Sequence, residues 1–326
     1  MIECNQRGLK QMSEEIFDCI ILGGGPAGLS AALYVRRANL NCAIVDLSAI
    51  GGTPANYCEI ENYLGFDKIN GYELCERFEE HVDKFDVQKF PYQEIKEIDL
   101  SGSIKKIKTL EKEFRAKSII IATGAKPRAL NIKGEKEFFG RGVSYCAVCD
   151  GAFYKDKVVC VIGGGNSALE EADYLTRFAK KVYLIHRRDE FRADKIIQDR
   201  ILRNKKIELV LDSIPTEIIG EDKVRAIRIQ NIKTNDIKEI NTDGIFPYIG
   251  IEPNVEMFSG QVEQDKNGFI VTDNSMKTTT EGVWAIGDIR NTPLRQVITA
   301  VADGAIAGVS VSKYIASVSE EIRVKG

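Results

Sequence analysis

Residues 17–46 read FDCIILGGGPAGLSAALYVRRANLNCAIVD, and their pattern indicates the fold class of the chain. An apolar, Ile-rich run at 17–22 predicts a buried strand, residues 29–38 predict a helix, and residues 41–45 predict a second strand that ends at Asp46. The turn GGGPAG separates the first strand from the helix. A strand, a glycine-rich turn, a helix and a strand within about 30 residues form the building block of a doubly wound α/β fold.

The same order of elements recurs at residues 157–186, KVVCVIGGGNSALEEADYLTRFAKKVYLIH. The expected strand, helix and second strand of this copy lie at 157–162, 169–179 and 181–185. The first glycine and the last residue are 23 positions apart in both copies, Gly23 to Asp46 and Gly163 to His186. Because the copies superpose without a gap, the chain is predicted to contain two Rossmann-like dinucleotide-binding domains.

Three positions of each turn call for small residues. The first allows the tight turn out of the strand, the second lets the backbone approach a pyrophosphate, and the third lets the helix pack close to the strand. These positions hold Gly23, Gly25 and Gly28 in the first copy and Gly163, Gly165 and Ala168 in the second. A single such turn can be a plain connector, but two copies in the same context predict two phosphate sites at helix N-termini.

The residue at the end of the second strand is expected to meet the adenosine ribose of a bound dinucleotide. Asp46 can accept hydrogen bonds from ribose hydroxyls, which suits FAD or NAD. The second copy has His186, Arg187 and Arg188 there, with Arg192 a turn later, and guanidinium groups suit a 2′-phosphate. Alone, the run HRRDEFR would be a solvated loop, but its place in the second copy predicts NADP(H).

Cys146 and Cys149 have the motif-like CxxC spacing, in the run CAVCDG before the second copy. Two cysteines three positions apart at a helix start can close a small disulfide ring, and the helix N-terminus favours the thiolate. The alternatives are half a zinc site, which lacks a second CxxC or an HxxxH, and two buried core thiols. Since the chain has only two histidines, the proton donor for a leaving thiolate is expected to be Asp150.

The composition indicates a globular protein of two domains. The 326 residues carry 45 Lys+Arg against 48 Asp+Glu, a net charge of −3, and 44% are hydrophobic. These values exclude disorder and leave no electrostatic footprint for nucleic acid or an anionic membrane. We find no signal peptide, no apolar run of about 18 residues and no GxSxG motif. Eight cysteines without a disulfide framework indicate a reducing compartment, and we expect a cytoplasmic protein.

The other cysteines are expected to be structural. Cys19, Cys42 and Cys160 fall in predicted buried strands, and Cys75 falls on the apolar face of a predicted helix. Cys58 follows a Gly-Gly pair in a loop near the first phosphate site, so a functional role is considered for it. We favour packing there too, because unpaired cysteines tend to be buried.

A further strand is expected at 282–286, running into Gly287 and Asp288, with a helix at 296–314 that is rich in small residues suited to close packing. Neither belongs to the second copy. The simplest organisation is therefore a first domain interrupted by an inserted second one, with seams where apolar strands end in Gly and Pro. We assign residues 1–124 and 254–326 to the first domain, with 1–15 as an N-terminal appendage, and 125–253 to the second.

The motifs GGGPAG, ATG, CAVCDG, GGGNSA, HRRDEFRA, IGIEPN and GD with RQVITA, in this order and spacing, resemble those of the low-molecular-weight thioredoxin reductases. The resemblance covers nearly the whole chain from residue 16, and CxxCDG just before the second fingerprint is highly specific. It implies FAD in the discontinuous domain, NADPH and a redox disulfide in the inserted domain, and a homodimer. A hydride would pass from NADPH to FAD, two electrons to the disulfide, and the dithiol would exchange with oxidised thioredoxin.

The resemblance also implies residue roles. Cys149 would be the thiol next to the flavin, Cys146 the thiol that attacks the partner disulfide, and Asp150 the acid/base. No metal ligand is implied. The cofactor-binding residues would be Gly23, Gly25, Pro26, Ala27, Gly28, Asp46, Gly51, Gly52, Asn62, Ala122, Thr123, Gly124, Gly163, Gly165, Asn166, Ser167, Ala168, His186, Arg187, Arg188, Arg192, Gly250, Gly287, Asp288, Arg295, Gln296 and Val297.

One loop departs from the family pattern. After Gly51 and Gly52 the family continues Gln-Leu, whereas this chain continues Thr53-Pro54 in a loop that ends at Asn62 and is expected near the flavin. Donor and acceptor therefore stay open. Some relatives take electrons from ferredoxin, although the intact HRRDEFR argues against that here. The acceptor could also be a different small dithiol protein, and a nucleotide-binding redox sensor without turnover is a third interpretation.

Overall fold

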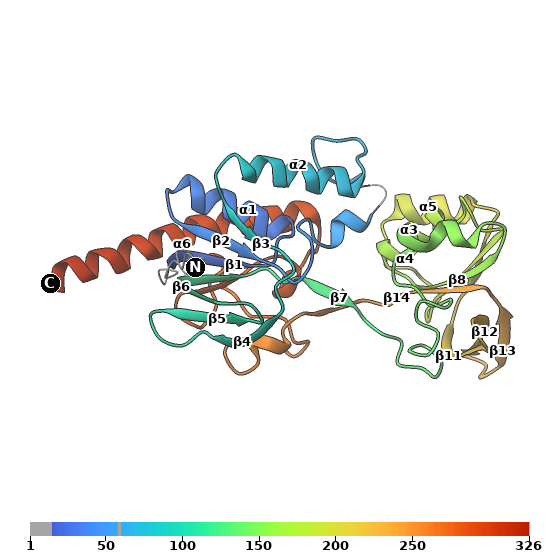
Figure 1. The fold of residues 1–326 in the computed structure, drawn as a ribbon. Helices are drawn as coiled ribbons and strands as arrows, with labels where there is room; N and C mark the ends of the chain where they lie inside the picture. The colour runs from blue at the N-terminus through green and yellow to red at the C-terminus, as the bar shows by residue number, and fades with distance from the viewer. Residues whose placement is uncertain (1–14, 58–59, 326) are drawn as a thin grey trace, which may run out of the picture. The chain divides into compact units, whose positions relative to one another are not determined.

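The computed structural model describes residues 15–57 and 60–325, so most of the expected N-terminal appendage lies outside the described residues (Figure 1). The chain divides into two compact units. Unit 1 is Met1–Ala125 with Pro253–Gly326, and unit 2 is Lys126–Glu252. The chain passes between the units twice, and the two passages pair as the short strands β7 (Ala125–Pro127) and β15 (Ile251–Pro253).

Unit 1 is built on a twisted sheet with the strand order β3-β2-β1-β6-β5-β4, and β16 also pairs with β6. The strands are β1 (Ile16–Leu22), β2 (Cys42–Val45), β3 (Gln88–Phe90), β4 (Ile95–Asp99), β5 (Lys105–Thr109), β6 (Glu113–Ile121) and β16 (Val283–Ala285). The central strand β1 pairs in parallel with β2 and with β6, which places Ile20 opposite Ala43 and Ile119. Both faces of β1 are buried, as a continuous apolar run requires.

Helices α1 (Pro26–Arg37), α2 (Gly71–Asp83) and α6 (Val297–Lys325) complete unit 1, and α1 contacts both of the others (Figure 1). Short 3₁₀ turns lie at η1 (Thr53–Asn56), η3 (Glu256–Phe258) and η4 (Gly287–Ile289). Helix α6 packs closely on α1, because a Cβ added to Gly304 would lie 2.3 Å from the carbonyl oxygen of Ala27. The expected close packing of the small-residue helix is therefore confirmed, although Ala302 is exposed.

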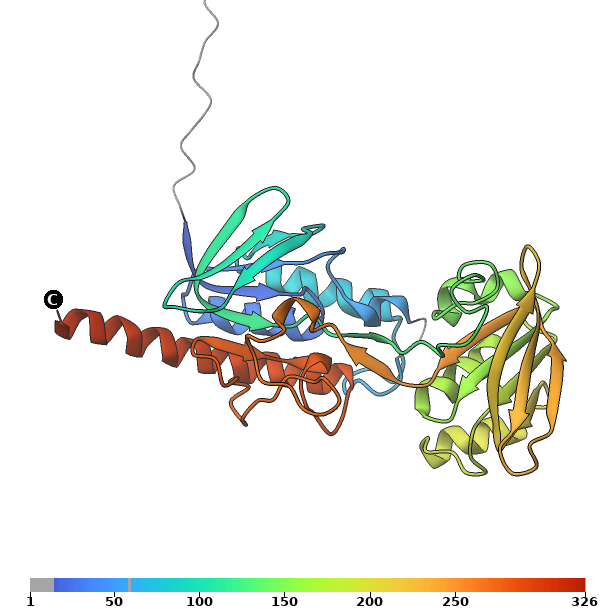
Figure 2. The same ribbon diagram turned by 90° about the horizontal axis from the view of Figure 1, so that it is seen from below.

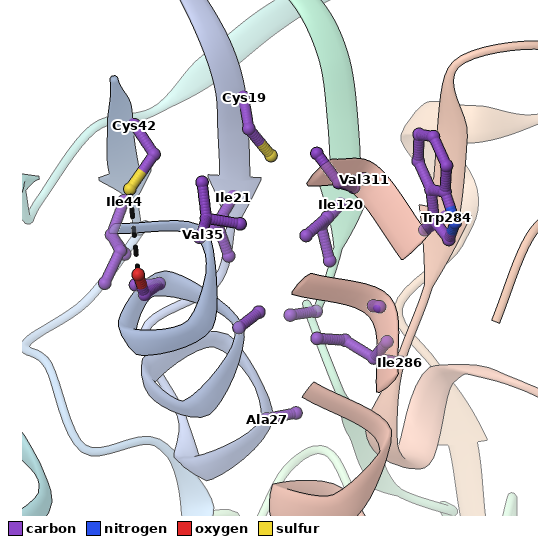
Figure 3. Close-up of a cluster of buried hydrophobic side chains, with 14 of the residues drawn as sticks. Cys19, Ile21, Ala27, Val35, Cys42, Ile44, Ile120, Trp284, Ile286 and Val311 are labelled. Carbon is purple, nitrogen blue, oxygen red and sulfur yellow. Dashed lines mark hydrogen bonds between the residues drawn. The ribbon is translucent and has the colours of Figure 1, made fainter. Parts of the chain in front are cut away.

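A hydrophobic cluster joins these helices to the sheet, and Val35 of α1, Val311 of α6, Trp284 of β16 and Ile120 of β6 all belong to it (Figure 3). Two cysteine side chains belong to the same cluster, Cys19 on β1 and Cys42 on β2 (Figure 3). Burial raises the pKa of the Cys42 thiol to about 12, so it stays protonated and unreactive. The structural role expected for these two and for the buried Cys75 and Cys160 is confirmed. Cys58 lies outside the described residues.

Unit 2 has a parallel sheet with the strand order β10-β9-β8-β14. Its strands are β8 (Val158–Gly163), β9 (Lys181–Ile185), β10 (Ile207–Val210) and β14 (Gly244–Tyr248). Helices α3 (Ala147–Asp150), α4 (Asn166–Leu175) and α5 (Lys195–Arg203), with the 3₁₀ turn η2 (Gly151–Tyr154) directly after α3, share one core with it. The antiparallel strands β11 (Ser213–Gly220), β12 (Val224–Asn231) and β13 (Ile237–Asn241) form the other core with the opposite face (Figure 2).

The α/β class with two parallel strand–turn–helix copies is confirmed, and the bounds of all three expected helices differ from expectation. Helix α1 begins earlier, at Pro26, because proline suits the first helical position. Helix α4 ends at Leu175 rather than 179, where tighter bonds such as Phe178 N–H to the Leu175 carbonyl take over. Helix α6 continues to Lys325, since no Gly or Pro lies between Tyr314 and Lys325 to stop it. Within the described chain, none of the helices combines the length and apolar character needed to cross a membrane.

Candidate dinucleotide sites and redox disulfide

The first glycine-rich turn, between β1 and α1, is closed by backbone contacts that exclude larger residues. Gly23 has a φ of 110°, and a Cβ there would lie 2.3 Å from the carbonyl oxygen of Ala122. A Cβ on Gly28 would lie 1.9 Å from the carbonyl oxygen of Gly23. Gly25 precedes α1 as its N-cap, with no side chain of its own to bond the first N–H groups. Those donors are therefore presented at the turn, as a pyrophosphate site requires.

Asp46 lies at the end of β2 and holds this turn in place. Its Oδ2 accepts a hydrogen bond of 2.5 Å from Gly24 N–H, and its Oδ1 accepts from the backbone N–H and hydroxyl of Ser48 at 2.7 and 3.0 Å. The carboxylate is half-buried. It therefore fixes the turn and the following loop, in addition to the ribose contact expected from the sequence.

Gly51 and Gly52 lie against this turn, and the loop that follows them reaches the start of α6. A Cβ on Gly52, whose φ is 67°, would lie 2.8 Å from Cα of Gly25, and Gly51 N–H donates to the Gly24 carbonyl at 2.9 Å. Asn62, after the unusual loop, donates through Nδ2 to Oε1 of Gln296 at 3.0 Å, so the loop end is tied to the start of α6. The structure thus brings together residues from three distant parts of the sequence.

The turn at Gly287 and Asp288 lies next to α1, since a Cβ on Gly287 would be 3.1 Å from Cβ of Ala27. Burial raises the pKa of the Asp288 carboxyl, and the Arg295 guanidinium opposes that shift. The Arg295 Nε is buried and finds no hydrogen-bond partner among the residues that the structure describes. Buried donors are normally hydrogen-bonded, so this nitrogen is a candidate donor to a bound ligand.

Asp303 in α6 supports the same turn, and sequence reasoning missed it. The side chain is buried, and its Oδ2 accepts from Gly287 N–H at 3.1 Å and from Nη1 of Arg290 at 3.4 Å. An acid within a helix of small apolar residues was the available signal. A charge at a close-packed helix face needs partners, and here a backbone N–H and an arginine supply them.

The second turn, between β8 and α4, repeats the first with different closing contacts. A Cβ on Gly163 would lie 2.3 Å from the carbonyl oxygen of Tyr248, and Gly165 has open space around it. Asn166, the first residue of α4, bonds Asp194 at 2.8 Å in both directions, through Nδ2 to the carboxylate and through Oδ1 from the backbone N–H. Ser167 is exposed and Ala168 is buried. The start of α4 is therefore anchored to the start of α5.

His186 and the arginines that follow it occupy different environments. The His186 ring is buried, stacks on Phe191 with ring centroids 5.4 Å apart, and lies where a Cβ on Gly164 would clash at 2.2 Å. Burial lowers its pKa, so the ring is neutral at pH 7. Arg187, Arg188 and Arg192 are exposed, and among the described residues their guanidinium groups have no ion-pair partner. His186 supports the turn, while the arginines are free to meet an anion.

The expected redox pair is a disulfide, Cys146–Cys149, with the two Cα atoms 5.3 Å apart. Cys146 is the N-cap of α3, and its Sγ accepts a hydrogen bond from Cys149 N–H at 3.1 Å. Cys149 is exposed and Cys146 is half-buried. Asp150 follows directly, and burial together with the Asp150 charge raises the pKa of Tyr154 to about 12.

Several polar groups hold the segment around the disulfide, and sequence reasoning did not find them. Ser144 Oγ accepts from Cys146 N–H at 3.1 Å, and the phenol oxygen of Tyr248 accepts from Ala147 N–H at 3.0 Å. The Tyr145 hydroxyl donates to the buried Glu135 at 2.6 Å. Glu135 also accepts from the backbone N–H groups of residues 130 and 131, each at 2.7 Å. For Ser144 and Tyr145 the only sequence signal was their position just before the CxxC motif, and for Tyr248 and Glu135 there was none.

The remaining predicted residues lie at the seams of the two units. The Thr123 hydroxyl donates to the Asn254 carbonyl at 3.1 Å, and Asn254 N–H donates to the Gly124 carbonyl. Gly250, with a φ of 127°, accepts from Arg128 N–H at 2.9 Å. Direct cofactor contacts for these residues stay predictions, as do those of the two turns.

One family model, a sequence relative and two solved structures all relate this chain to the same family of proteins. Residues 17–304 match the family model described as pyridine nucleotide-disulphide oxidoreductase. A thioredoxin reductase of Bacillus subtilis (strain 168) is 44% identical over 314 residues, 96% of this chain and 99% of that protein. The crystal structure of Lactococcus lactis thioredoxin reductase has a TM-score of 0.90 at 44% identity, covering 92% of this chain and 99% of that one. That of T. acidophilum has a TM-score of 0.87 at 35% identity, with the same coverage.

Proposed function

The chain belongs to the thioredoxin reductases within the pyridine nucleotide-disulphide oxidoreductase family, and from this membership we propose that it reduces oxidised thioredoxin with electrons from NADPH. FAD is the proposed resident cofactor, held by unit 1. The observation that carries the proposal is the conjunction of two glycine-rich turns with a disulfide on unit 2. When bound, the flavin supplies the two-electron chemistry that connects a nicotinamide to a disulfide.

The residues of unit 1 fit FAD. The turn at Gly23–Gly28 is too tight for larger residues, since added Cβ atoms at both glycines would collide with backbone oxygen. The N-terminus of α1, which this turn leads into, offers backbone N–H donors to a pyrophosphate. Arg295 Nε, buried and without a partner among the described residues, offers a donor to an oxygen of the cofactor. The half-buried Asp288 beside it would accept from a cofactor hydroxyl. The positive N-terminal end of the long helix α6, next to Gln296, favours negative charge on a reduced ring.

The residues of unit 2 fit NADPH better than NADH. Arg187, Arg188 and Arg192 are exposed, and within the described chain no carboxylate neutralises them. Guanidinium groups bind phosphate oxygens through paired, charge-assisted hydrogen bonds. A 2′-phosphate on the adenosine ribose would therefore replace water on three cations. This preference also favours NADPH over ferredoxin as the donor.

The disulfide segment fits dithiol–disulfide exchange. Opening Cys146–Cys149 consumes two electrons and two protons and gives two thiols. Cys149 N–H, 3.1 Å from Sγ of Cys146, is placed to stabilise a thiolate on Cys146. Asp150, adjacent to Cys149, is the proposed proton carrier. The Cys146 thiolate would attack the partner disulfide, and Cys149 would then release the partner as a dithiol.

Thioredoxin is the proposed acceptor because the Bacillus subtilis relative, which matches this chain over nearly its whole length, is named thioredoxin reductase. A different small dithiol protein is the alternative acceptor. A homodimer is proposed from the family resemblance, and a reducing compartment such as the cytoplasm is proposed from the eight cysteines without a disulfide framework. Size-exclusion chromatography with light scattering would give about twice the chain mass of 36.3 kDa if the dimer forms.

The test is NADPH-dependent reduction of oxidised thioredoxin, followed at 340 nm. Cys146→Ser is expected to remove turnover, because the exchange step needs both thiols. The matched control is Cys160→Ala, a buried thiol of the same unit, which should keep turnover. Turnover that survives in Cys146→Ser would overturn the proposed route of electrons. Reduction of another dithiol protein but not of thioredoxin would leave the disulfide chemistry and replace the acceptor.

A further inference from the structure

Tyr248 is the acceptor for the backbone N–H group in the middle of the redox segment. Its phenol oxygen lies 3.0 Å from the nitrogen of Ala147, the residue that follows Cys146. Ala147 is fully buried, so water does not replace this acceptor when the phenol oxygen is removed. A buried N–H group without an acceptor is strongly disfavoured.

Tyr248 is itself held rigidly. It is the last residue of β14, in parallel register with Gly163 of β8, and its carbonyl oxygen closes the second glycine-rich turn. The strand therefore fixes where the phenol oxygen lies, and through it the position of Ala147. A side chain on a strand of the sheet is a more precise support than one on a loop.

The hydrogen bond from Ala147 matters differently in the two redox states of the segment. In the oxidised protein the covalent bond between Cys146 and Cys149 fixes the turn. In the dithiol that bond is gone, and hydrogen bonds alone hold the turn that places Cys149 N–H against Sγ of Cys146. Support from Tyr248 is therefore worth more to the reduced state than to the oxidised state.

We propose that Tyr248 is a positioning residue for the redox pair, which keeps the first turn of α3 in place when the disulfide opens and so preserves the hydrogen bond from Cys149 N–H to the Cys146 sulfur. This inference deepens the proposed function and rests on it for its purpose. By stabilising the reduced state, Tyr248 makes the disulfide easier to reduce and the Cys146 thiolate more available for exchange.

The test needs neither NADPH nor thioredoxin, so its outcome is independent of the proposed function. The purified protein is equilibrated with dithiothreitol mixtures, in which one protein S–S bond breaks, one reagent S–S bond forms, and two electrons and two protons pass between them. In Tyr248→Phe the equilibrium should move toward the protein disulfide by about threefold to tenfold. A tenfold change corresponds to about 30 mV for a two-electron couple. Alkylation of the reduced protein by iodoacetamide at pH 7 should slow by a similar factor.

Tyr145→Phe is the matched control. It removes a phenol hydroxyl from the residue next to Cys146, but that hydroxyl donates to Glu135 and supports no N–H group of the redox segment. We expect a change below about twofold in both measurements. Thermal unfolding of both variants separates a general loss of stability from a redox effect, because a purely structural role would destabilise both redox states equally.

A second variant removes the donor instead of the acceptor. Ala147→Pro lacks the N–H group at the first helical position, where proline is tolerated, and Cys146 has the extended φ of −137° and ψ of 95° that precede a proline. If the hydrogen bond is the cause, Tyr248→Phe has no further effect on the equilibrium in this background. An unchanged equilibrium in Tyr248→Phe, or an equal shift in Tyr145→Phe, would overturn the proposal.

Discussion

The two strand–turn–helix copies of this chain have the same spacing, and they differ in what supports the turn. Asp46 in the first copy accepts a hydrogen bond from Gly24 N–H, whereas His186 at the matching position of the second lies with its neutral ring against Gly164. Both side chains reach the middle glycine of the turn. This position therefore supports the turn in both copies, and the arginines that follow His186 are the residues proposed to bind a 2′-phosphate.

The helices after the two turns differ as well. Ala31 in α1 is fully buried, and α6 packs so closely that a Cβ on Gly304 would lie 2.8 Å from the Ala31 nitrogen. The matching residue in α4 is Glu171, also buried, and its Oε2 has no hydrogen-bond partner within the described chain. The first helix is covered by a glycine-bearing helix, and the second carries a buried carboxyl. Unit 2 thus carries the free-energy cost of a buried carboxyl at a position where unit 1 has an alanine.

The largest effect is expected from exchanging the third small residue of the turns. Gly28→Ala places a methyl group 1.9 Å from a backbone oxygen, so the turn must shift. We expect a loss of about 3 kcal/mol in unfolding free energy and of bound flavin. Ala168→Gly, the matched change in unit 2, should cost about 1 kcal/mol. Flavin absorbance per chain measures bound flavin, and thermal unfolding measures stability, in both variants. Equal losses in the two variants would show that the two turns are equally sensitive at this position.

A smaller, pH-dependent effect is expected from Glu171→Gln. Burial, with the neighbouring Glu170 charge second, raises the pKa of Glu171 from 4.5 to about 7. Between these values the unfolded chain releases the proton while the folded chain keeps it, so the native protein loses stability as pH rises. The loss is complete above pH 7 and amounts to at most about 3 kcal/mol. The variant should therefore be more stable than the native protein at pH 8.

The pH dependence distinguishes this effect from ordinary repacking. Below pH 4.5 the carboxyl is protonated in both states, so the advantage of Glu171→Gln should vanish there. The measurement is the midpoint of thermal unfolding across pH 4 to 8 for both proteins. A stability difference that is the same at every pH would contradict the buried-carboxyl explanation.

The smallest effect is expected from Asp46→Asn. An amide keeps an acceptor for Gly24 N–H but turns an NH₂ group toward the donors of Ser48. We expect a loss of about 1 kcal/mol in stability and weaker flavin retention during dialysis. Ser48→Ala removes one of the three hydrogen bonds and should cost less. A larger loss in Ser48→Ala than in Asp46→Asn would show that the loop, not the turn, depends on this carboxylate.

Sequence pattern predicted the two copies, their strands and the redox cysteines, because strand periodicity, glycine turns and CxxC are local signals. It missed contacts that join distant segments. Glu135 and Tyr145 are ten positions apart, Asp303 meets Gly287 across the start of α6, and Tyr248 reaches Ala147 over about a hundred residues. Such partners depend on how strands and helices pack, which periodicity does not encode.

The end of the second strand shows the same limit. The sequence predicts one basic cluster from His186 to Arg192, yet the structure buries the histidine and exposes the arginines. Residue type alone does not separate them, because strand β9 determines which side chain points inward.

Anaerobic stopped-flow bleaching of the flavin tests whether the arginines of unit 2 select a 2′-phosphorylated donor, as proposed. NADPH and NADH are compared in the native protein and in the Arg187→Ala/Arg188→Ala double variant. We expect half-saturation at a concentration about tenfold to hundredfold lower for NADPH than for NADH in the native protein, and nearly equal values in the variant. Equal bleaching of the native protein by both nucleotides, or by neither while reduced ferredoxin bleaches it, would show that unit 2 does not select NADPH.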